Sequence, residues 1–190
     1  MKNTVYVFAR APRLGTVKRR LAAALGARAA LRFYRTTLAA TLRRLIPDRR
    51  FRTVLALTPA RAHGPWRRGM PVVGQGGGDL GRRMHRVMAR HRRGCVAIVG
   101  ADIPCLHADD VAAAFRRVRG ADACFGPAED GGYWLVALGP RRPSRPFDGV
   151  RWSGPHALAD TLANFRAHRV VFGRTLRDVD TATDLEALRT

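Results

Sequence analysis

Two kinds of apolar pattern alternate along the chain. Short apolar runs bounded by glycine, proline or charged residues are typical of strands. They occupy residues 4–9, 52–58, 70–73, 95–100, 123–125, 133–138 and 170–172. Longer stretches with apolar residues at helical spacing lie between them, at residues 18–46, 79–91, 107–119, 154–169 and 184–189. The alternation predicts an α/β fold with a mainly parallel central sheet.

Glycine, proline and capping residues set several of the predicted boundaries. Gly26 divides residues 18–46 into a short helix and a longer one, which ends before Pro47. Thr181 and Asp184 have the spacing of a capping box at the start of the last helix. In a mainly parallel sheet, ligands bind beyond the carboxyl ends of the strands. The loops that follow the strands are therefore the expected positions of functional residues.

Positive charge is concentrated in the first part of the chain. The 35 lysines and arginines outnumber the 14 acidic residues, for a net charge of +21. Residues 1–78 hold seventeen basic residues and one acid, a net charge of +16, and the remaining residues carry +5. Such a field attracts polyanions such as nucleic acid, anionic lipid or a phosphorylated small molecule. Arginine outnumbers lysine 33 to 2, and we expect much of it to lie on a solvated surface.

Composition and missing motifs argue against several classes of protein. A chain of 190 residues with 46% hydrophobic content fits one domain with a real core, and no linker or repeat divides it. It lacks both an apolar stretch near the roughly 18 residues of a membrane span and a signal-peptide pattern. We therefore expect a cytoplasmic protein with no membrane span. Three cysteines without a CxxC pair argue against structural zinc, and two serines without a GxSxG motif argue against a serine hydrolase.

The loop between the first strand and the first helix is strongly basic. It lies within VFARAPRLGTVKRRLAAALG, residues 7–26, which contains no acid. Its basic residues are Arg10, Arg13, Lys18, Arg19 and Arg20. Basic side chains beside backbone N–H groups form an anion site, and Gly15 allows close backbone approach. Lys18 is one of only two lysines, and its compact ammonium suits a point contact with phosphate. The loop favours phosphate binding, and a solvated helix start is the alternative.

A glycine-rich loop, GQGGGDLGRRM, follows the strand at residues 70–73. Gln75 carries both a donor and an acceptor for the edge of a base. Gly76 and its neighbouring glycines allow close approach to a flat or phosphorylated ligand. Asp79 has two interpretations, as a ligand contact or as the cap of the following helix.

Acidic residues gather after other strands. Asp102 directly follows the apolar strand at residues 95–100, a position suited to holding Mg²⁺ or to accepting local backbone N–H groups. Glu129 and Asp130 precede a glycine pair, and Asp178 and Asp180 precede the capping box. Asp180 is a candidate second metal ligand, whereas Asp178 is a candidate partner for a nearby arginine. Carboxylates gathered together need cations between them.

Six blocks of the sequence resemble, in order, segments of the DUF2064 family. They are FARAPRLGTVKRRLAAALG, GQGGGDLGRRM, VGADIPCL, GPAEDGGYWLVAL, FDGVRWSGPHAL and LRDVDTATDLEAL. This family is similar to GT-A-type glycosyltransferases, including radical-SAM/selenodomain-associated transferases, and to the guanylyltransferases of F420 and molybdenum-cofactor synthesis. The resemblance spans nearly the whole chain. It implies a single-domain, three-layer nucleotide-diphospho-sugar transferase fold.

The resemblance also implies roles for individual residues. The basic loop that faces a triphosphate in related nucleotidyltransferases is matched by Arg10, Arg13, Lys18 and Arg20. The loop near the base or ribose is matched by Gln75 and Asp79. The ligands of Mg²⁺ or Mn²⁺ are matched by Asp102 and Asp180. The acceptor side is matched by Glu129, Asp130, Gly131, Gly132, Trp152 and Ser153.

These observations lead to three functional hypotheses. We favour a Mg²⁺-dependent nucleotidyltransferase, in which a small phosphate or carboxylate acceptor attacks the α-phosphate of a nucleoside triphosphate and pyrophosphate leaves. Lys18 and the arginines would neutralise the pyrophosphate, and Asp102 would hold the metal with Asp180. The alternative is a glycosyltransferase with a nucleoside-diphosphate-sugar donor, in which Glu129 or Asp130 acts as base or orients the sugar.

The third hypothesis is a non-catalytic protein that binds polyanions. It is less favoured because the basic residues are not interleaved with aromatic ones, as nucleic-acid binding would require. We therefore expect a nucleotide substrate and a small-molecule acceptor as partners, and no specific nucleic acid.

Overall fold

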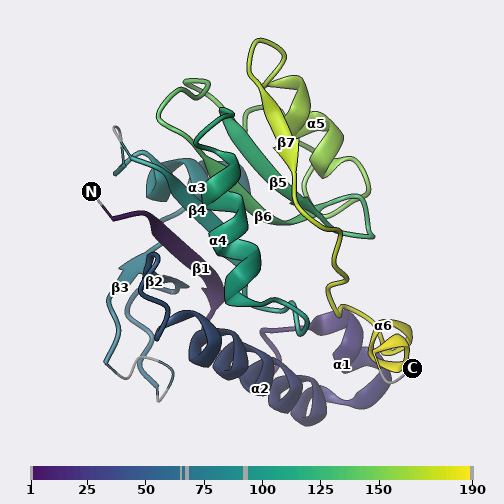
Figure 1. The fold of residues 1–190 in the computed structure, drawn as a ribbon. Helices are drawn as coiled ribbons and strands as arrows, with labels where there is room; N and C mark the ends of the chain where they lie inside the picture. The colour runs from purple at the N-terminus through teal and green to yellow at the C-terminus, as the bar shows by residue number, and fades with distance from the viewer. Residues whose placement is uncertain (1, 65, 67–68, 92–93, 189–190) are drawn as a thin grey trace.

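A computed structural model describes residues 2–64, 66, 69–91 and 94–188 of the chain. Within them a seven-stranded sheet has the order β3-β2-β1-β4-β6-β5-β7 (Figure 1). The strands are β1 (Thr4–Arg10), β2 (Arg52–Thr58), β3 (Val72–Gly74), β4 (Val96–Gly100), β5 (Ala123–Pro127), β6 (Tyr133–Leu138) and β7 (Val170–Phe172). β6 is antiparallel to β4 and β5, whereas the other paired strands are parallel. The predicted mainly parallel sheet is confirmed.

Helices cover both faces of this sheet, which gives three layers. The helices are α1 (Arg19–Leu25), α2 (Ala27–Leu45), α3 (Leu80–Met88), α4 (Ala108–Arg117), α5 (Ala157–Ala163) and α6 (Ala182–Ala187). Side chains of α2 and α4 form a buried cluster on one face of the sheet, and those of α3 and α5 pack in a second cluster on the other. α1 contacts both α2 and α6.

The strand sequences explain this layering. Along β1, Val5 and Val7 belong to the cluster with α2 and α4, while the intervening Tyr6 belongs to the cluster with α3. Successive side chains of a strand point to opposite faces, so a sheet covered on both sides needs apolar residues at every position. Burial of each large apolar side chain contributes roughly 1.5–3 kcal/mol relative to exposure. The apolar residues of β1 are thus explained by helices that cover both faces of the sheet.

Two predicted elements differ markedly from the structure in their bounds, and a few predicted residues lie outside the described ones. The expected helix over residues 154–169 is wrong in length, because α5 ends before Asn164, whose amide donates to the carbonyls of Pro146 and Asp148. The strand expected at residues 70–73 is displaced toward its carboxyl end. Residue 189 of the last predicted helix, with residues 65, 67 and 68 of the predicted loop at 59–69, lies outside the described residues. The Thr181–Asp184 capping box is confirmed.

The fold brings distant segments to one edge of the sheet. β1 and β4 are parallel neighbours, so the loops that follow them begin side by side. Asp178 and Asp180 were expected to end a strand, and this expectation is wrong. The segment between β7 and α6 that carries them is irregular, with one β-bridge at Leu176. It runs from the β7 side of the molecule back to α1 (Figure 1). Its acidic residues therefore reach the ends of β1 and β4.

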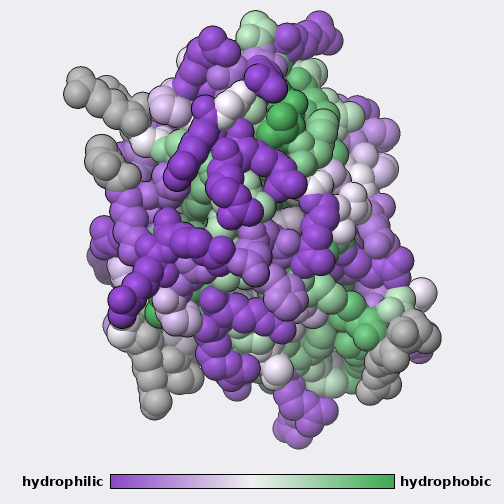
Figure 2. Space-filling model, in the orientation of Figure 1, coloured by the Kyte–Doolittle hydropathy of each residue, from purple (hydrophilic) through white to green (hydrophobic). Residues whose placement is uncertain are grey.

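The surface is predominantly polar. Hydrophilic side chains cover most of the face shown in Figure 2, and smaller hydrophobic areas lie near β7 and near α1 and α6. Phe172 and Leu25 are among the exposed large apolar side chains of these elements. None of the described helices is both long and apolar enough to cross a bilayer.

Candidate active site

The site is built around Lys18. Its ammonium donates hydrogen bonds to Asp102 Oδ2 at 2.6 Å and to Asp180 Oδ1 at 2.5 Å. The Lys18 side chain is only 4% exposed, so these ion pairs hold the charge away from water. Burial by itself would lower the pKa of Lys18, but the two carboxylates outweigh it and raise the pKa above its ordinary value. Lys18 is therefore held as a cation at all moderate pH values.

The backbone is strained at this position. Lys18 has a φ of 47° in the left-handed region, which costs energy for any residue with a Cβ. Ser153 has a φ of 66°, and these two are the non-glycine residues with positive φ among those described. Both line the same cavity. Backbone strain of this kind concentrates at functional sites, where surrounding contacts enforce it.

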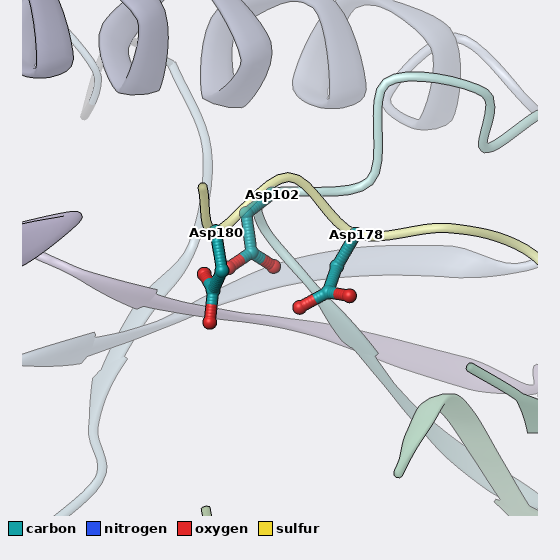
Figure 3. A group of neighbouring side chains, drawn as sticks. All are labelled: Asp102, Asp178 and Asp180. Atoms are coloured by element: carbon teal, nitrogen blue, oxygen red, sulfur yellow. The ribbon is translucent and has the colours of Figure 1, made fainter. Parts of the chain in front are cut away.

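Three carboxylates lie close together next to Lys18, and Figure 3 shows these three side chains. Asp102 lies on the loop after β4, and Asp178 and Asp180 lie on the segment between β7 and α6. One oxygen from each lies within 4.8 Å of the others. Mg²⁺ and Mn²⁺ prefer oxygen ligands, and ligands on opposite sides of Mg²⁺ lie about 4.2 Å apart at its bond length of about 2.1 Å. The three side chains therefore fit a divalent cation with small adjustments.

Asp178 carries the electrostatic cost of this gathering. Partial burial and, after it, the nearby carboxylates of Asp130, Asp180 and Asp102 raise the pKa of Asp178 to about 6, against the smaller lowering effect of Lys18. Asp178 was a candidate partner for an arginine from the sequence, but it lies in the carboxylate cluster instead. The signal that identifies it is the Asp-Val-Asp spacing, because residues i and i+2 of an extended segment point to the same side.

A cavity of about 600 Å³, which we call the basic cavity, opens on one side of the carboxylates. Its basic lining residues are Arg10, Lys18, Arg19 and Arg20. Tyr34 fixes the strand end beneath it, because its hydroxyl accepts from the Arg10 N–H and donates to the Arg10 carbonyl. Three of the four predicted phosphate-binding side chains, those of Arg10, Lys18 and Arg20, thus meet in one cavity.

A second cavity of about 390 Å³, which we call the aromatic cavity, opens on the other side. Its aromatic lining residues are Phe8, Tyr133, Trp134 and Trp152. The two cavities share Phe8, Asp102, Asp130, Ser153 and Asp180. Both volumes lie in or near the range of small-molecule sites. The carboxylates therefore stand at a boundary between two connected compartments of different character.

The two predicted acceptor-side acids are placed differently. Asp130 lines both cavities, and its Oδ1 accepts from the Gly132 N–H at 2.8 Å. Glu129 points elsewhere and forms an ion pair with Arg177. Of the two, Asp130 is the one positioned to contact a ligand that occupies either cavity.

The glycine-rich loop before α3 has mainly internal contacts. The Gln75 amide is buried, donates to the carbonyls of Ala9 and Ala56, and accepts from Arg83. Its hydrogen-bonding groups thus anchor the loop to β1 and β2 rather than facing a base. Asp79 is the N-cap of α3, where its side chain accepts from the Arg82 N–H.

The remaining predicted residues line neither cavity; they are Arg13, Gly15, Gly76 and Gly131. Gly76 has a φ of 79° and packs against the guanidinium of Arg86, which donates to the neighbouring Gln75 carbonyl. Gly15 has a φ of 73° and forms the exposed turn of the basic loop, where the Arg13 carbonyl accepts from Thr16. The roles assigned to these residues from the sequence stay predictions.

Comparison with known families identifies the chain. A model of the DUF2064 family, described as an uncharacterized protein conserved in bacteria, matches residues 41–154, more than half of the chain. The chain belongs to the DUF2064 family. No curated protein matches it. The family assignment agrees with the resemblance carried by the six sequence blocks.

Solved structures show what the DUF2064 chain is similar to. A Desulfovibrio desulfuricans G20 protein assigned to the nucleotide-diphospho-sugar transferases is 28% identical, with a TM-score of 0.91 over 99% of this chain and 87% of that one. CMP:2-keto-3-deoxy-manno-octonic acid synthetase, solved with CTP, is 11% identical, with a TM-score of 0.61 over 100% and 97%.

Glucosyl-3-phosphoglycerate synthase from Mycobacterium tuberculosis, solved with Mn²⁺, UDP and glucosyl-3-phosphoglycerate, is also 11% identical, with a TM-score of 0.60 over 98% of this chain and 75% of that one. The chain therefore has the fold of nucleotide-dependent transferases.

Proposed function

We propose that this protein is a divalent-metal-dependent nucleotidyltransferase that uses a nucleoside triphosphate. The observation that carries the proposal is the junction of the basic cavity with the carboxylate cluster. Four basic side chains line one cavity and meet three carboxylates that fit a divalent cation. A triphosphate needs more positive charge than a donor already reduced to a diphosphate, and it is usually bound together with a metal.

The arginines and the aspartates of the site would have different roles. Arg10, Arg19 and Arg20 would bind the phosphates from the open side of the basic cavity. Asp102, Asp178 and Asp180 would hold Mg²⁺ or Mn²⁺, which supplies charge stabilisation to the transferring phosphoryl group.

Lys18 connects the two sets. Its ammonium contacts Asp102 and Asp180 but lines the basic cavity. Movement away from the carboxylates would bring the ammonium to the phosphates. Cations aimed at the departing pyrophosphate stabilise the charge that develops as the bond to the α-phosphorus breaks.

A glycosyltransferase is the second candidate. The Desulfovibrio structure, 28% identical over nearly the whole chain, is assigned to the nucleotide-diphospho-sugar transferases, which favours a nucleoside-diphosphate-sugar donor. In that case the same carboxylates and metal would stabilise a leaving nucleoside diphosphate, and Asp130 would orient the sugar.

Calorimetry with nucleotides tests the choice of donor. The four nucleoside triphosphates and a panel of nucleoside-diphosphate sugars are titrated into the protein at 150 mM salt, with Mn²⁺ or with EDTA. We expect one triphosphate to bind in Mn²⁺ and to lose most of its affinity in EDTA. Tighter metal-dependent binding of a diphosphate sugar would establish the second candidate instead.

Two arginine variants separate local contacts from the general field of the protein. Arg20 lines the basic cavity, whereas Arg28 is exposed on α2 outside it. Arg20→Ala and Arg28→Ala remove the same charge, so a field effect would weaken nucleotide binding equally in both. We expect a several-fold loss for Arg20→Ala and little change for Arg28→Ala. Equal losses, or equal binding of every polyanion regardless of metal, would contradict the proposal.

A further inference from the structure

The aromatic cavity differs in charge from the rest of the molecule. The protein contains 35 lysines and arginines, yet none lines this cavity within the part of the chain that the structure describes. Its charged lining residues are Asp102, Asp130, Asp178 and Asp180. The lining of this cavity is therefore negatively charged, although the protein as a whole has a net charge of +21.

Lys18 and a bound divalent cation together would not neutralise the four carboxylates of the aromatic cavity. Lys18 contributes one positive charge at the boundary, and a divalent cation on the carboxylates would contribute two more. Against the four carboxylates, one net negative charge would remain. An incoming phosphate or carboxylate would therefore meet repulsion and no partner.

The arginines nearest in sequence to the lining residues already have partners. Arg177 pairs with Glu129, and Arg151 pairs with Asp160 through two hydrogen bonds of 2.8 and 2.9 Å. Arg83 on α3 donates to Gln75, while Leu80 and Met84 of the same helix line the cavity. These contacts direct the guanidinium groups to other partners.

The walls of the cavity fit a flat apolar body. The rings of Tyr133 and Trp152 pack edge to face with centroids 6.4 Å apart, and Phe8 stands between the two cavities. Aromatic faces also attract cations, most strongly at tryptophan. The same surface thus accepts an apolar ring or an ammonium group and offers nothing to an anion.

We propose that the aromatic cavity binds the acceptor, and that this acceptor is a hydroxyl or amine compound with an apolar or aromatic body and no negative charge near its reacting atom. This replaces the phosphate or carboxylate acceptor expected from the sequence. The inference rests on the proposed function for the reaction itself. As the acceptor's oxygen or nitrogen bonds to the α-phosphorus, the bond to pyrophosphate breaks with its electron pair, and the acceptor's proton passes to Asp130 or solvent.

Three probes that share one body test the proposal without nucleotide. Benzylamine, benzyl alcohol and benzyl phosphate are titrated in EDTA into ¹⁵N-labelled protein, and the indole signal of Trp152 is followed by NMR. We expect benzylamine and benzyl alcohol to shift this signal at millimolar concentration, and benzyl phosphate to bind at least tenfold more weakly. Tighter binding of the phosphate at this signal, or no binding of any probe, would overturn the inference.

Variants tie the result to the cavity. Trp152→Ala should abolish the response of the remaining indole signals, those of Trp66 and Trp134, to benzylamine. Trp66 packs in the cluster on the opposite face of the sheet, so Trp66→Phe should leave the response of the Trp152 signal unchanged. Asp178→Asn is isosteric and should reduce the preference for benzylamine over benzyl phosphate several-fold. If Asp178→Asn kept the full preference for benzylamine over benzyl phosphate, the carboxylates would not be the reason that the cavity disfavours anions. Because no donor is present, these outcomes do not depend on the nucleotide titrations that test the proposed function.

Discussion

The two cavities are adjacent but were built from different parts of the chain. The basic cavity takes its cations from residues 10–20, in the region of the sequence that carries +16, and the aromatic cavity takes its rings mainly from β6 and Trp152, with Phe8 of β1. They share the carboxylates of Asp102, Asp130 and Asp180. The comparison shows that overall charge is a poor guide to a ligand, because only the side chains that line a cavity select what enters it.

The difference also gives the site a direction. Under the two proposals above, an anionic donor would be attracted from the basic side, and a neutral or cationic acceptor would be accommodated from the other. Among the described residues, the ion pairs of Asp102 and Asp180 come from the basic side, through Lys18. The charge pattern would then separate two substrates that meet at the carboxylates, and each prediction below alters one side of it.

Substitution of Asp102, a carboxylate that lines both cavities, should have the largest effect, a loss of metal affinity. Asp102→Asn deletes a carboxylate that contacts Lys18 and belongs to the candidate metal cluster. Loss of partners that only orient metal ligands costs about 10- to 100-fold in affinity, so loss of a ligand should cost at least about 100-fold. Mn²⁺ binding followed by electron paramagnetic resonance measures this directly.

A matched control for this variant is Asp109→Asn. Asp109 is a largely exposed carboxylate in the first turn of α4, and its partner is Arg50 rather than Lys18. It should leave Mn²⁺ binding unchanged. Retention of full Mn²⁺ affinity by Asp102→Asn would show that Asp102 is not a metal ligand. It would also contradict a metal site at the carboxylates between the two cavities.

Lys18 contacts two carboxylates and also lines the basic cavity, so its removal should have two opposite effects. Lys18→Met frees Asp102 and Asp180 from a competing ammonium, and we expect Mn²⁺ to bind about tenfold more tightly without nucleotide, about 1.4 kcal/mol. The same variant should bind the triphosphate about tenfold more weakly at saturating Mn²⁺, with a smaller loss for the monophosphate.

Two calorimetric titrations separate these effects of Lys18→Met. Circular dichroism first shows whether the variant is folded. Changes of Mn²⁺ and triphosphate affinity in the same direction would mean that Lys18 acts only as a structural ion pair. Equal losses for triphosphate and monophosphate would mean that it acts only through the general field.

The sequence predicted most elements of this fold because the relevant information is local. Apolar runs and helical spacing identified all seven strands within the described residues, and the Thr181–Asp184 box marked the start of α6. The position of β6, antiparallel between two parallel sets, was not predictable from local pattern. It depends on which strand edge remains free after the others have paired.

The site was predictable as a set of loops but not as a set of contacts. Lys18, Asp102 and Asp180 were each identified by their positions after strands. Their hydrogen bonds span 84 and 162 residues, and no spacing rule links them. Gln75 shows the converse, because its polar amide suggested ligand binding, whereas its burial depends on Ala9 and Ala56 of neighbouring strands.

The smallest expected effect concerns the stability cost of gathering carboxylates on one side of the boundary. The pKa of Asp178 is about 6 in the folded protein, against an ordinary value of 3.8. The folded state therefore binds more protons than the unfolded state between these values, and stability falls as pH rises from about 4 to 6. Above pH 6 the whole penalty is present. Full burial would make it about 3 kcal/mol, and screening at this half-buried side chain reduces it to about 1 kcal/mol.

Asp178→Asn removes the charge and should therefore stabilise the protein by about 1 kcal/mol at pH 8. The gain should shrink as the pH falls through 6 and be small near pH 4, because Asp178 is then protonated in the folded state and partly protonated in the unfolded state. Urea denaturation in EDTA at these three pH values measures the difference, with Asp148→Asn, an exposed carboxylate outside both cavities, as the control. A gain that did not depend on pH would show that Asp178 carries no unpaired charge, and the contrast between the cavities would then rest on the arginines alone.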